Sequence, residues 1–174
     1  MRFFSLVFLT VLLGGCLGYP EGVTPVADFK LSRYLGKWYE IARLDHSFER
    51  GLSNVAAEYS LRDDGGVRVV NRGFMAREKS WKQAEGTARF VRSKNEGYLK
   101  VSFFGPFYSS YVLFELDEEY QYAFVTGYNQ SYLWLLARTP TVDSGLIDRF
   151  IERAKQLGFE TDELIFVEHD RPSL

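Results

Sequence analysis

The sequence predicts an all-β protein, an eight-stranded antiparallel up-and-down barrel with one C-terminal helix packed outside it. Aromatic residues, which favour strands, make up 17% of the 174 residues. Short runs of alternating apolar and polar residues follow one another through most of the chain. A helical period occurs only once, near the C-terminus. Many short strands at close spacing are typical of a barrel or a sandwich, and 174 residues suit a single domain.

The eight alternating runs extend from residue 38 to residue 138. Asp63-Asp64-Gly65-Gly66, between the second and third runs, is a hairpin-turn signal. Strands joined by such tight turns pair antiparallel with their neighbours in sequence. The expected strands are Trp38 to Leu44, Val55 to Leu61, Val67 to Phe74, Ala84 to Val91, Tyr98 to Phe104, Tyr111 to Leu116, Ala123 to Tyr128 and Tyr132 to Arg138.

A helix is expected near 143–157, where apolar residues recur three and four positions apart. Thr141 is the expected N-cap, Asp143 suits the first turn, and Gly158 can end the helix. The single apolar stripe predicts that this helix packs against the outside of the barrel. The run Leu164 to Val167 can add an edge strand, so the barrel domain is expected over 30–170.

The N-terminus indicates export and lipid anchoring. Arg2 precedes an apolar run from Phe3 to Leu13, which is too short for a permanent membrane helix and is typical of a signal peptide. Leu13-Gly14-Gly15-Cys16 resembles a bacterial lipobox, so residues 1–15 are expected to be a lipoprotein signal peptide and Cys16 the lipid-attachment site. An ordinary signal peptide is the alternative. Residues 16–29 are expected to form a tether, and Leu17 indicates the periplasmic face of the outer membrane.

Composition and motifs favour binding over catalysis. A net charge of −2 argues against a nucleic-acid partner. The sequence has no nucleophile elbow, phosphate loop or zinc motif, and its histidines, His46 and His169, have no ligand spacing. We therefore expect no enzyme activity, cofactor or metal. A structural envelope protein, a partner-binding module or, less readily, a lipid-modifying enzyme are the alternatives.

The topology predicts how one end of the barrel is closed. If strands run up and down, the start of the first strand, the turn after the sixth and the end of the eighth meet at the same end. Trp38 can then cover the floor with the Arg138 guanidinium over its indole, and Gly36 leaves room for it.

Three segments, GKWYEIARLDHSFERG, LDEEYQYAFV and LWLLARTP, resemble the signature regions of the lipocalin family. The resemblance extends from about Phe29 to Val167 and is strongest to the bacterial lipoprotein members. It implies an eight-stranded barrel with a flanking helix and a small apolar ligand inside. Two glutamates separate Asp117 from Tyr120, which departs from the usual second motif. The matching floor residues are Gly36, Trp38, Asp117, Tyr120 and Arg138.

Alternation from Trp38 predicts which residues line the interior. The small side chains among them favour a cavity, and a filled core is the alternative. Glu40 falls in the same register and needs a polar partner or a ligand group. The expected ligand-binding residues are Ala42, Ala57, Tyr59, Val69, Asn71, Ala88, Phe90, Val101, Phe103, Tyr111, Leu113, Trp134 and Leu136.

The loops at the opposite end carry bulky apolar and basic residues. An apolar cavity below a basic rim predicts a fatty acid or a lysophospholipid as the ligand, with its polar head at the rim. The rim aromatics can instead contact the membrane or a second copy in a homodimer, and a solvated charged rim is the plainest alternative. The expected rim residues are Phe48, Arg50, Arg77, Lys79, Phe107 and Tyr108.

Overall fold

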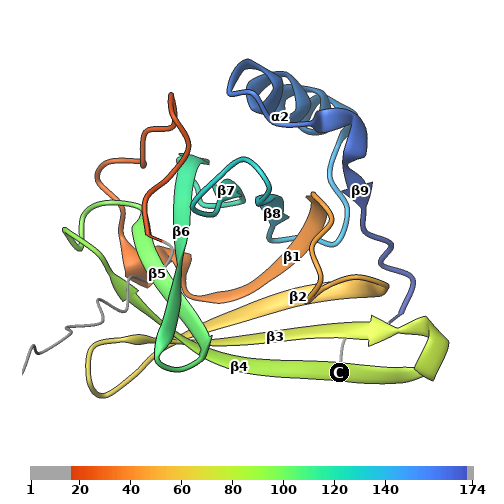
Figure 1. Cartoon of the computed structure of the whole chain (residues 1–174), viewed down its shortest axis with the longest axis horizontal. Helices are drawn as coiled ribbons and strands as arrows, with labels where there is room; N and C mark the ends of the chain where they lie inside the picture. The colour runs from red at the N-terminus through yellow and green to blue at the C-terminus, as the bar shows by residue number, and fades with distance from the viewer. Residues whose placement is uncertain (1–16, 172–174) are drawn as a thin grey trace, which may run out of the picture.

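The computed structural model describes residues 17–171, so the expected signal peptide over 1–15 and the expected lipid-attachment residue Cys16 lie outside the described residues. The strands enclose a barrel, and a helix lies on its outside (Figure 1). The helices are α1 (Leu31–Tyr34), α2 (Ser144–Gln156) and the short 3₁₀ segments η1 (Ala76–Glu78) and η2 (Thr161–Glu163). The strands are β1 (Gly36–Arg43), β2 (Leu52–Leu61), β3 (Val67–Met75), β4 (Ser80–Phe90), β5 (Tyr98–Phe104), β6 (Phe107–Leu116), β7 (Tyr122–Thr126), β8 (Leu133–Ala137) and β9 (Ile165–Phe166).

The sheet is a closed ring of eight antiparallel strands, which confirms the predicted fold. Consecutive strands pair from β2 to β8, and β1 closes the ring by pairing with both β8 and β2. Each strand therefore contacts its neighbours in sequence, as expected of an up-and-down barrel. β9 is an additional short strand that pairs with β1.

The C-terminal helix α2 packs on the outer wall of the barrel. Phe150 and Ala154 are fully buried there, and the Phe150 ring meets Phe124 of β7 with ring centroids 5.0 Å apart. The N-cap is Asp143 rather than Thr141, because the Asp143 carboxylate accepts a hydrogen bond from the Leu146 N–H at 3.0 Å. No helix within residues 17–171 is long and apolar enough to cross a membrane.

The segment after Leu17 packs against the barrel, so the expected tether over 16–29 is wrong for its described part. Val23 and Phe29 are 5% and 2% exposed. The Val26 N–H donates to the Leu113 carbonyl at 2.8 Å, and the Gly97 N–H donates to the Val26 carbonyl at 2.8 Å. Burial of these apolar side chains and pairing of this backbone hold the segment in place, although it shows no sequence periodicity.

The C-terminal segment completes the seam between β1 and β2. These strands pair directly only from Gly36 to Tyr39 of β1, after which they diverge. The Val167 N–H donates to the Ile41 carbonyl at 3.0 Å on one side. On the other side the Asn54 N–H donates to the Glu168 carbonyl at 2.8 Å. Residues 165–168 therefore bridge the divergent strands, at the right of Figure 1.

Candidate functional site

Trp38 closes one end of the barrel. Its side chain is fully buried, and its indole Nε1–H donates to the Tyr34 carbonyl at 2.7 Å. The Arg138 guanidinium lies 4.0 Å from the centroid of the Trp38 ring. Arg138 also donates to the carbonyls of Lys37 and Arg33, each at 2.8 Å. A buried indole and a guanidinium with several acceptors form a rigid floor.

The other predicted floor residues lie beside this pair. Gly36 has φ of +95°, and a Cβ there would lie 3.5 Å from Arg138. Asp117 Oδ2 accepts from the N–H groups of Glu119 and Gln121, so the two inserted glutamates belong to a tight turn. Tyr120 accepts from the Lys30 N–H with its hydroxyl and from Arg138 Nε with its carbonyl.

The inner face carries most of the predicted lining. Several of these side chains are only half-buried although they point inward, and Ala84, opposite Asn71, is exposed on the inner face. The interior is therefore accessible to solvent at the height of Asn71 and Ala84. The predicted residues in the inner apolar cluster are Ala57, Tyr59, Val69, Ala88, Phe90, Val101, Phe103, Tyr111, Leu113, Trp134 and Leu136.

The prediction for Ala42 is wrong, because the register of β1 shifts. Glu40 lies opposite Leu136, whereas Ala42 lies opposite Leu135, so a bulge at Ile41 reverses the alternation. Ala42 joins the outer core beneath α2. Arg43, opposite the inward-facing Trp134, is 1% exposed.

Glu40 and Arg43 belong to a buried polar cluster that alternation alone did not predict. Arg43 NH1 lies 2.5 Å from Glu40 Oε1. Arg43 NH2 also donates to the carbonyls of Glu49 and Leu52, at 3.1 and 3.2 Å. Trp134 Nε1 donates to Glu49 Oε2 at 3.2 Å. The cluster thus ties the β1–β2 loop to the barrel wall. Two charged residues within the apolar run of β1 were the available sequence signal.

Burial dominates the electrostatics of this cluster. It raises the pKa of Glu40 well above its ordinary value, and the nearby Glu49 carboxyl acts in the same direction. Burial also raises the pKa of Glu49. His46 is 7% exposed, and its burial together with the Arg43 charge lowers its pKa to about 4. The histidine is therefore neutral at neutral pH.

The β1–β2 loop places an aromatic stack over the interior. The His46 ring stacks on Phe48 with centroids 4.1 Å apart, and lies 5.0 Å from the Trp134 ring and 5.8 Å from the Tyr132 ring. Phe48 is 57% exposed. The loop therefore covers the β8 side of the mouth, with Phe48 on its surface.

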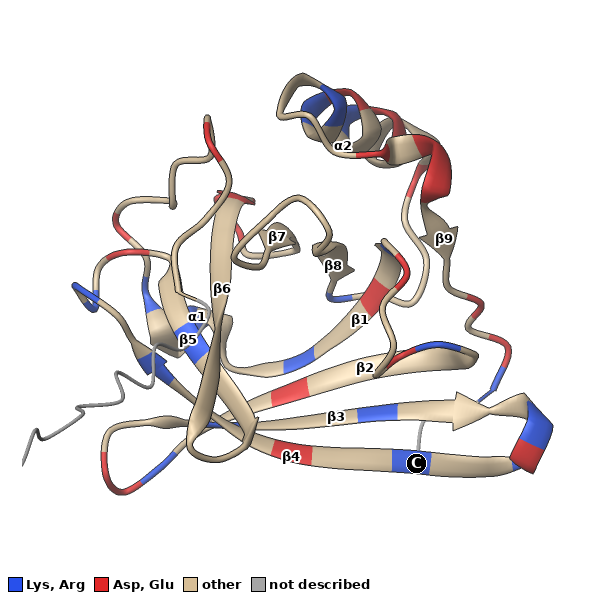
Figure 2. Ribbon diagram, viewed as in Figure 1, with Lys and Arg blue, Asp and Glu red and all other residues tan. Residues whose placement is uncertain are grey.

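The predicted rim residues do not form one basic patch. Arg50 pairs with Asp45, and Arg77 pairs with Glu78, which also pairs with Lys82. Figure 2 shows basic and acidic positions next to each other on the ribbon where η1 joins β3 to β4. Lys79, at the end of η1, has φ of +49°.

The aromatic part of the rim lies elsewhere. Phe107 is 66% exposed at the β5–β6 turn, where Phe104 is 80% exposed. Tyr108 lies under the Lys100 ammonium at 4.8 Å. In Figure 1 this turn lies well to the left of η1. The structure therefore separates Phe107 and Tyr108 from Arg77 and Lys79.

The hydrogen-bonded ladder between β4 and β5 covers only part of their length. These strands pair only over Thr87–Phe90 and Leu99–Ser102, although both extend further toward the mouth. A cleft of about 310 Å³ lies at the gap, beside Gly86 and Tyr108. The Phe103 ring occupies the space that a Cβ on Gly86 would need, with a separation of 2.8 Å.

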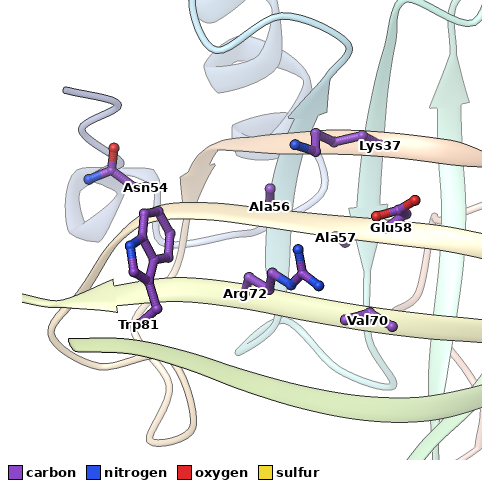
Figure 3. A pocket seen from close by; sticks show the side chains of 8 residues that line it. All are labelled: Lys37, Asn54, Ala56, Ala57, Glu58, Val70, Arg72 and Trp81. Carbon is purple, nitrogen blue, oxygen red and sulfur yellow. The ribbon is translucent and has the colours of Figure 1, made fainter. Parts of the chain in front are cut away.

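A second depression lies on the outer face of β1, β2 and β3 (Figure 3). Its volume is only about 20 Å³, enough for a single water molecule. Lys37 and Glu58 are directly opposite each other on its surface. Within residues 17–171 no group of three His, Cys, Asp or Glu side chains could hold a metal ion.

Residues 29–169 match the family described as Lipocalin-like domain. The outer membrane lipoprotein Blc of Vibrio cholerae serotype O1 is 63% identical over 169 residues, which cover 97% of this chain and 99% of that protein. The protein of the same name from Escherichia coli strain K12 is 49% identical, over 86% of this chain and 84% of its own length.

Solved structures share the fold at lower identity. Insecticyanin from the tobacco hornworm has a TM-score of 0.69 at 20% identity, over 87% of this chain and 86% of its own. The cockroach allergen Per a 4 has a TM-score of 0.67 at 19% identity, over 87% and 94%. The match of residues 29–169, the identity to both bacterial lipoproteins and the closed eight-stranded barrel agree, and the chain belongs to the lipocalin family.

Proposed function

We propose that this protein binds single-chain lipids, such as fatty acids or lysophospholipids, inside its barrel and stores or carries them in the bacterial envelope. The main support is the inner face, where apolar side chains such as Val101, Phe103 and Trp134 remain partly exposed although they point inward. Exposed apolar surface inside a closed wall gains free energy when an acyl chain covers it, at about 0.8 kcal/mol per buried methylene.

The ends of the barrel favour one chain over two. Trp38 and Arg138 close the floor, so a ligand enters from the mouth. An eight-stranded barrel has room for one small ligand. A phospholipid with two acyl chains should therefore bind poorly.

The proposed location is the periplasmic face of the outer membrane, with Cys16 carrying the lipid anchor. The lipobox-like Leu13-Gly14-Gly15-Cys16 supports this, although it lies outside the described residues. The relatives named outer membrane lipoprotein Blc support the same location. Several acyl chains on one cysteine give stable anchoring.

The binding test is displacement of a fluorescent fatty acid from the soluble Cys16→Ser protein by lysophospholipids of increasing chain length. We expect affinity to rise with chain length, and to fall when Trp134→Ala removes part of the lining. The matched control is Trp81→Ala, which removes an indole from the outer wall, where it packs on Phe74. Affinity that is indifferent to chain length would contradict an acyl-chain ligand.

The role of the rim is tested separately with an Arg77→Glu/Lys79→Glu variant. If these residues attract anionic heads, the variant should lose affinity for lysophospholipids with a net negative head and keep its affinity for zwitterionic ones. Because Arg77 already pairs with Glu78, we expect a loss of only a few-fold. Equal affinity of variant and wild type for both head types would exclude a rim contribution.

Self-association is a second candidate function, supported by Phe104 and Phe107, which are exposed together at the β5–β6 turn. Sedimentation of the soluble protein over a range of concentrations tests it. We expect a concentration-dependent dimer that a Phe104→Ser/Phe107→Ser variant abolishes. A wild type that stays monomeric throughout would exclude it.

A further inference from the structure

The described chain begins on the outer face of β5 and β6, here called the β5–β6 wall. The Gly18 N–H donates to the Tyr98 hydroxyl at 2.8 Å, and that hydroxyl lies 3.5 Å from Ser110 Oγ. The Tyr19 ring meets the Tyr98 ring edge-on, with centroids 5.3 Å apart. The Arg92 guanidinium lies 5.3 Å from the centroid of the Tyr98 ring. These contacts hold the first described residues against the wall.

The proposed lipid anchor is therefore joined to the barrel without a linker. Only Leu17 lies between Cys16 and Gly18, and consecutive Cα atoms are about 3.8 Å apart. Leu17 itself is 44% exposed. Because the chain from Gly18 onward is held on the β5–β6 wall, acyl chains on Cys16 that enter a bilayer bring this wall to the bilayer surface.

Two exposed aromatic rings lie on the same hairpin. Phe104 and Phe107 pair with each other at the β5–β6 turn and are 80% and 66% exposed. Along β6, Phe107 is three residues from Ser110, or about 10 Å in a strand. Burial of such rings in the interface of a bilayer removes apolar surface from water, and aromatic side chains favour the level of the head groups.

The charge of this hairpin suits an anionic surface. From residue 97 to residue 114 the only charged side chain is Lys100, although the whole chain has a net charge of −2. The Lys100 ammonium lies over the Tyr108 ring at 4.8 Å and has no carboxylate partner within residues 17–171. Arg89, opposite Lys100 on β4, is paired with Asp64. Lys100 is thus the cation of the hairpin that an anionic phosphate can approach without displacing an ion pair.

We propose that the β5–β6 wall rests on an anionic lipid surface, with Phe104 and Phe107 at the level of the head groups and Lys100 beside their phosphates. This inference rests on the proposed lipid anchor at Cys16. A bilayer is favoured over a second copy as the partner, because the anchor holds the bilayer next to the wall at a high effective concentration. The β5–β6 turn belongs to the mouth end of the barrel, so the mouth opens beside the bilayer and a lipid reaches it without crossing bulk water.

The test places an environment-sensitive fluorophore, NBD, on the wall of the acylated protein. Cys16 is the only cysteine of the chain, and acylation blocks its thiol, so Gly105→Cys adds a single reactive thiol. Gly105 lies between the two phenylalanines, and a Cβ there meets no atom within 4 Å. The control is Gln156→Cys at the exposed end of α2, on the other side of the barrel in Figure 1. Both proteins are reconstituted into vesicles of phosphatidylethanolamine and phosphatidylglycerol.

We expect the emission of the label at residue 105 to shift to shorter wavelength, and lipids with a nitroxide at the head group to quench it. The label at residue 156 should show neither change. Equal responses at the two positions would overturn the proposal. A shift of the same size in the soluble Cys16→Ser protein, without vesicles and rising with protein concentration, would assign the wall to a second copy. If the acylated proteins do not float with the vesicles, the proposed anchor itself has failed.

Substitutions in the labelled protein assign the contact to named side chains. Lys100→Gln should shift the equilibrium between the docked and undocked wall about five-fold toward the undocked form, because it removes one basic residue from an anionic surface. Lys155→Gln, which removes an exposed lysine of α2, is the matched control and should leave the quenching unchanged. Phe104→Ser/Phe107→Ser should abolish the quenching while the protein still floats with the vesicles. Full quenching in that double variant would overturn the proposal.

Discussion

The Glu40 carboxylate and the Arg43 guanidinium meet at 2.5 Å inside the barrel wall, with 5% and 2% of the two side chains exposed. A bulge at Ile41 makes the contact possible, because it turns Arg43 toward the same side as Glu40. The pair connects β1 to the loop that covers the mouth, through the Glu49 and Leu52 carbonyls. The Arg43 guanidinium therefore contributes both to the stability of the barrel wall and to the position of the loop that covers the mouth.

Arg43→Met should strongly destabilise the protein, because it leaves Glu40 and Glu49 buried without a counter-charge. Removing one partner of a buried pair typically costs about 3–5 kcal/mol. Urea unfolding measures the loss. The control is Arg68→Met, which breaks the half-exposed Arg68–Glu85 pair and should cost about 1 kcal/mol or less.

A second variant separates charge from packing. Glu40→Gln added to Arg43→Met removes one of the two uncompensated carboxyls, so it should restore part of the lost free energy of unfolding. Equal stability of Arg43→Met and Arg68→Met would contradict a structural role for the buried pair.

His46 should destabilise the folded protein in acid. Its folded-state pKa of about 4 lies below the ordinary value of 6.5, so the unfolded chain binds a proton first as the pH falls. Stability is thus lost between pH 6.5 and 4, by up to about 3 kcal/mol in total. His46→Phe keeps an aromatic ring against Phe48 and Trp134 but cannot titrate.

The measurement is the difference in unfolding free energy between wild type and His46→Phe at pH 7 and pH 4.5. Glu40 and Glu49 are present in both proteins, and because His46 Nε2 lies 3.2 Å from Glu49 Oε2, the difference reports the imidazole together with its contact to Glu49. We expect the variant to gain relative to wild type as the pH falls. Parallel pH profiles would show that the imidazole is not buried in its neutral form.

Trp38→Ala should lower the melting temperature markedly, because truncation of a buried aromatic side chain costs about 3–5 kcal/mol. It also removes the surface on which the Arg138 guanidinium and the Tyr34 ring rest. Trp81→Ala, on the outer wall, is the matched control and should have a smaller effect. If the two variants have the same melting temperature, Trp38 is not the floor of the barrel.

Asn54 should stabilise the folded protein through both its backbone conformation and its side-chain hydrogen bonds. Its φ is +53°, and its side chain bonds Asp170 and the Arg171 N–H. Asn54→Gly loses the side-chain bonds alone, whereas Asn54→Ala also strains the backbone, at about 1 kcal/mol. The expected order of stability by urea unfolding is wild type, then glycine, then alanine. An alanine variant as stable as the glycine variant would show that this φ is not maintained.

Cys16→Ser should release the protein from membranes, since the variant cannot be acylated. Fractionation of cells into membrane and soluble periplasmic material, followed with an antibody, tests this. Sedimentation of the variant with membranes would place the anchor elsewhere in the chain.

Much of the fold could be predicted because the relevant signals are local. Alternation in each strand and the Asp63-Asp64-Gly65-Gly66 turn specify neighbouring antiparallel pairs, and a ring of such pairs is a barrel. The topology and the family motifs were enough to predict that Trp38, Arg138 and Tyr120 lie close together, because strand ends at one end of a barrel must converge.

The polar part of the interior could not be predicted, because it depends on non-local features. A bulge at Ile41 shifts the register of β1 by one residue, which exchanges Ala42 for Arg43 on the inner face. Tyr34 reaches the floor from a four-residue helix that has no periodic signature. The sequence predicted basic residues around η1, and they are there, but the ion pairs of Arg77 and Lys82 with Glu78 largely neutralise their positive charge.

The bridge of residues 165–168 across the β1–β2 seam has a consequence for the timing of assembly. β1 is made and exported early. Its hydrogen bonds are completed by β8 and β9, which lie much later in the chain. The barrel wall is therefore sealed only after nearly the whole polypeptide has crossed the inner membrane. Until that moment the strands do not enclose an interior, so the cavity that we propose to bind lipid exists only once the C-terminal segment is in place.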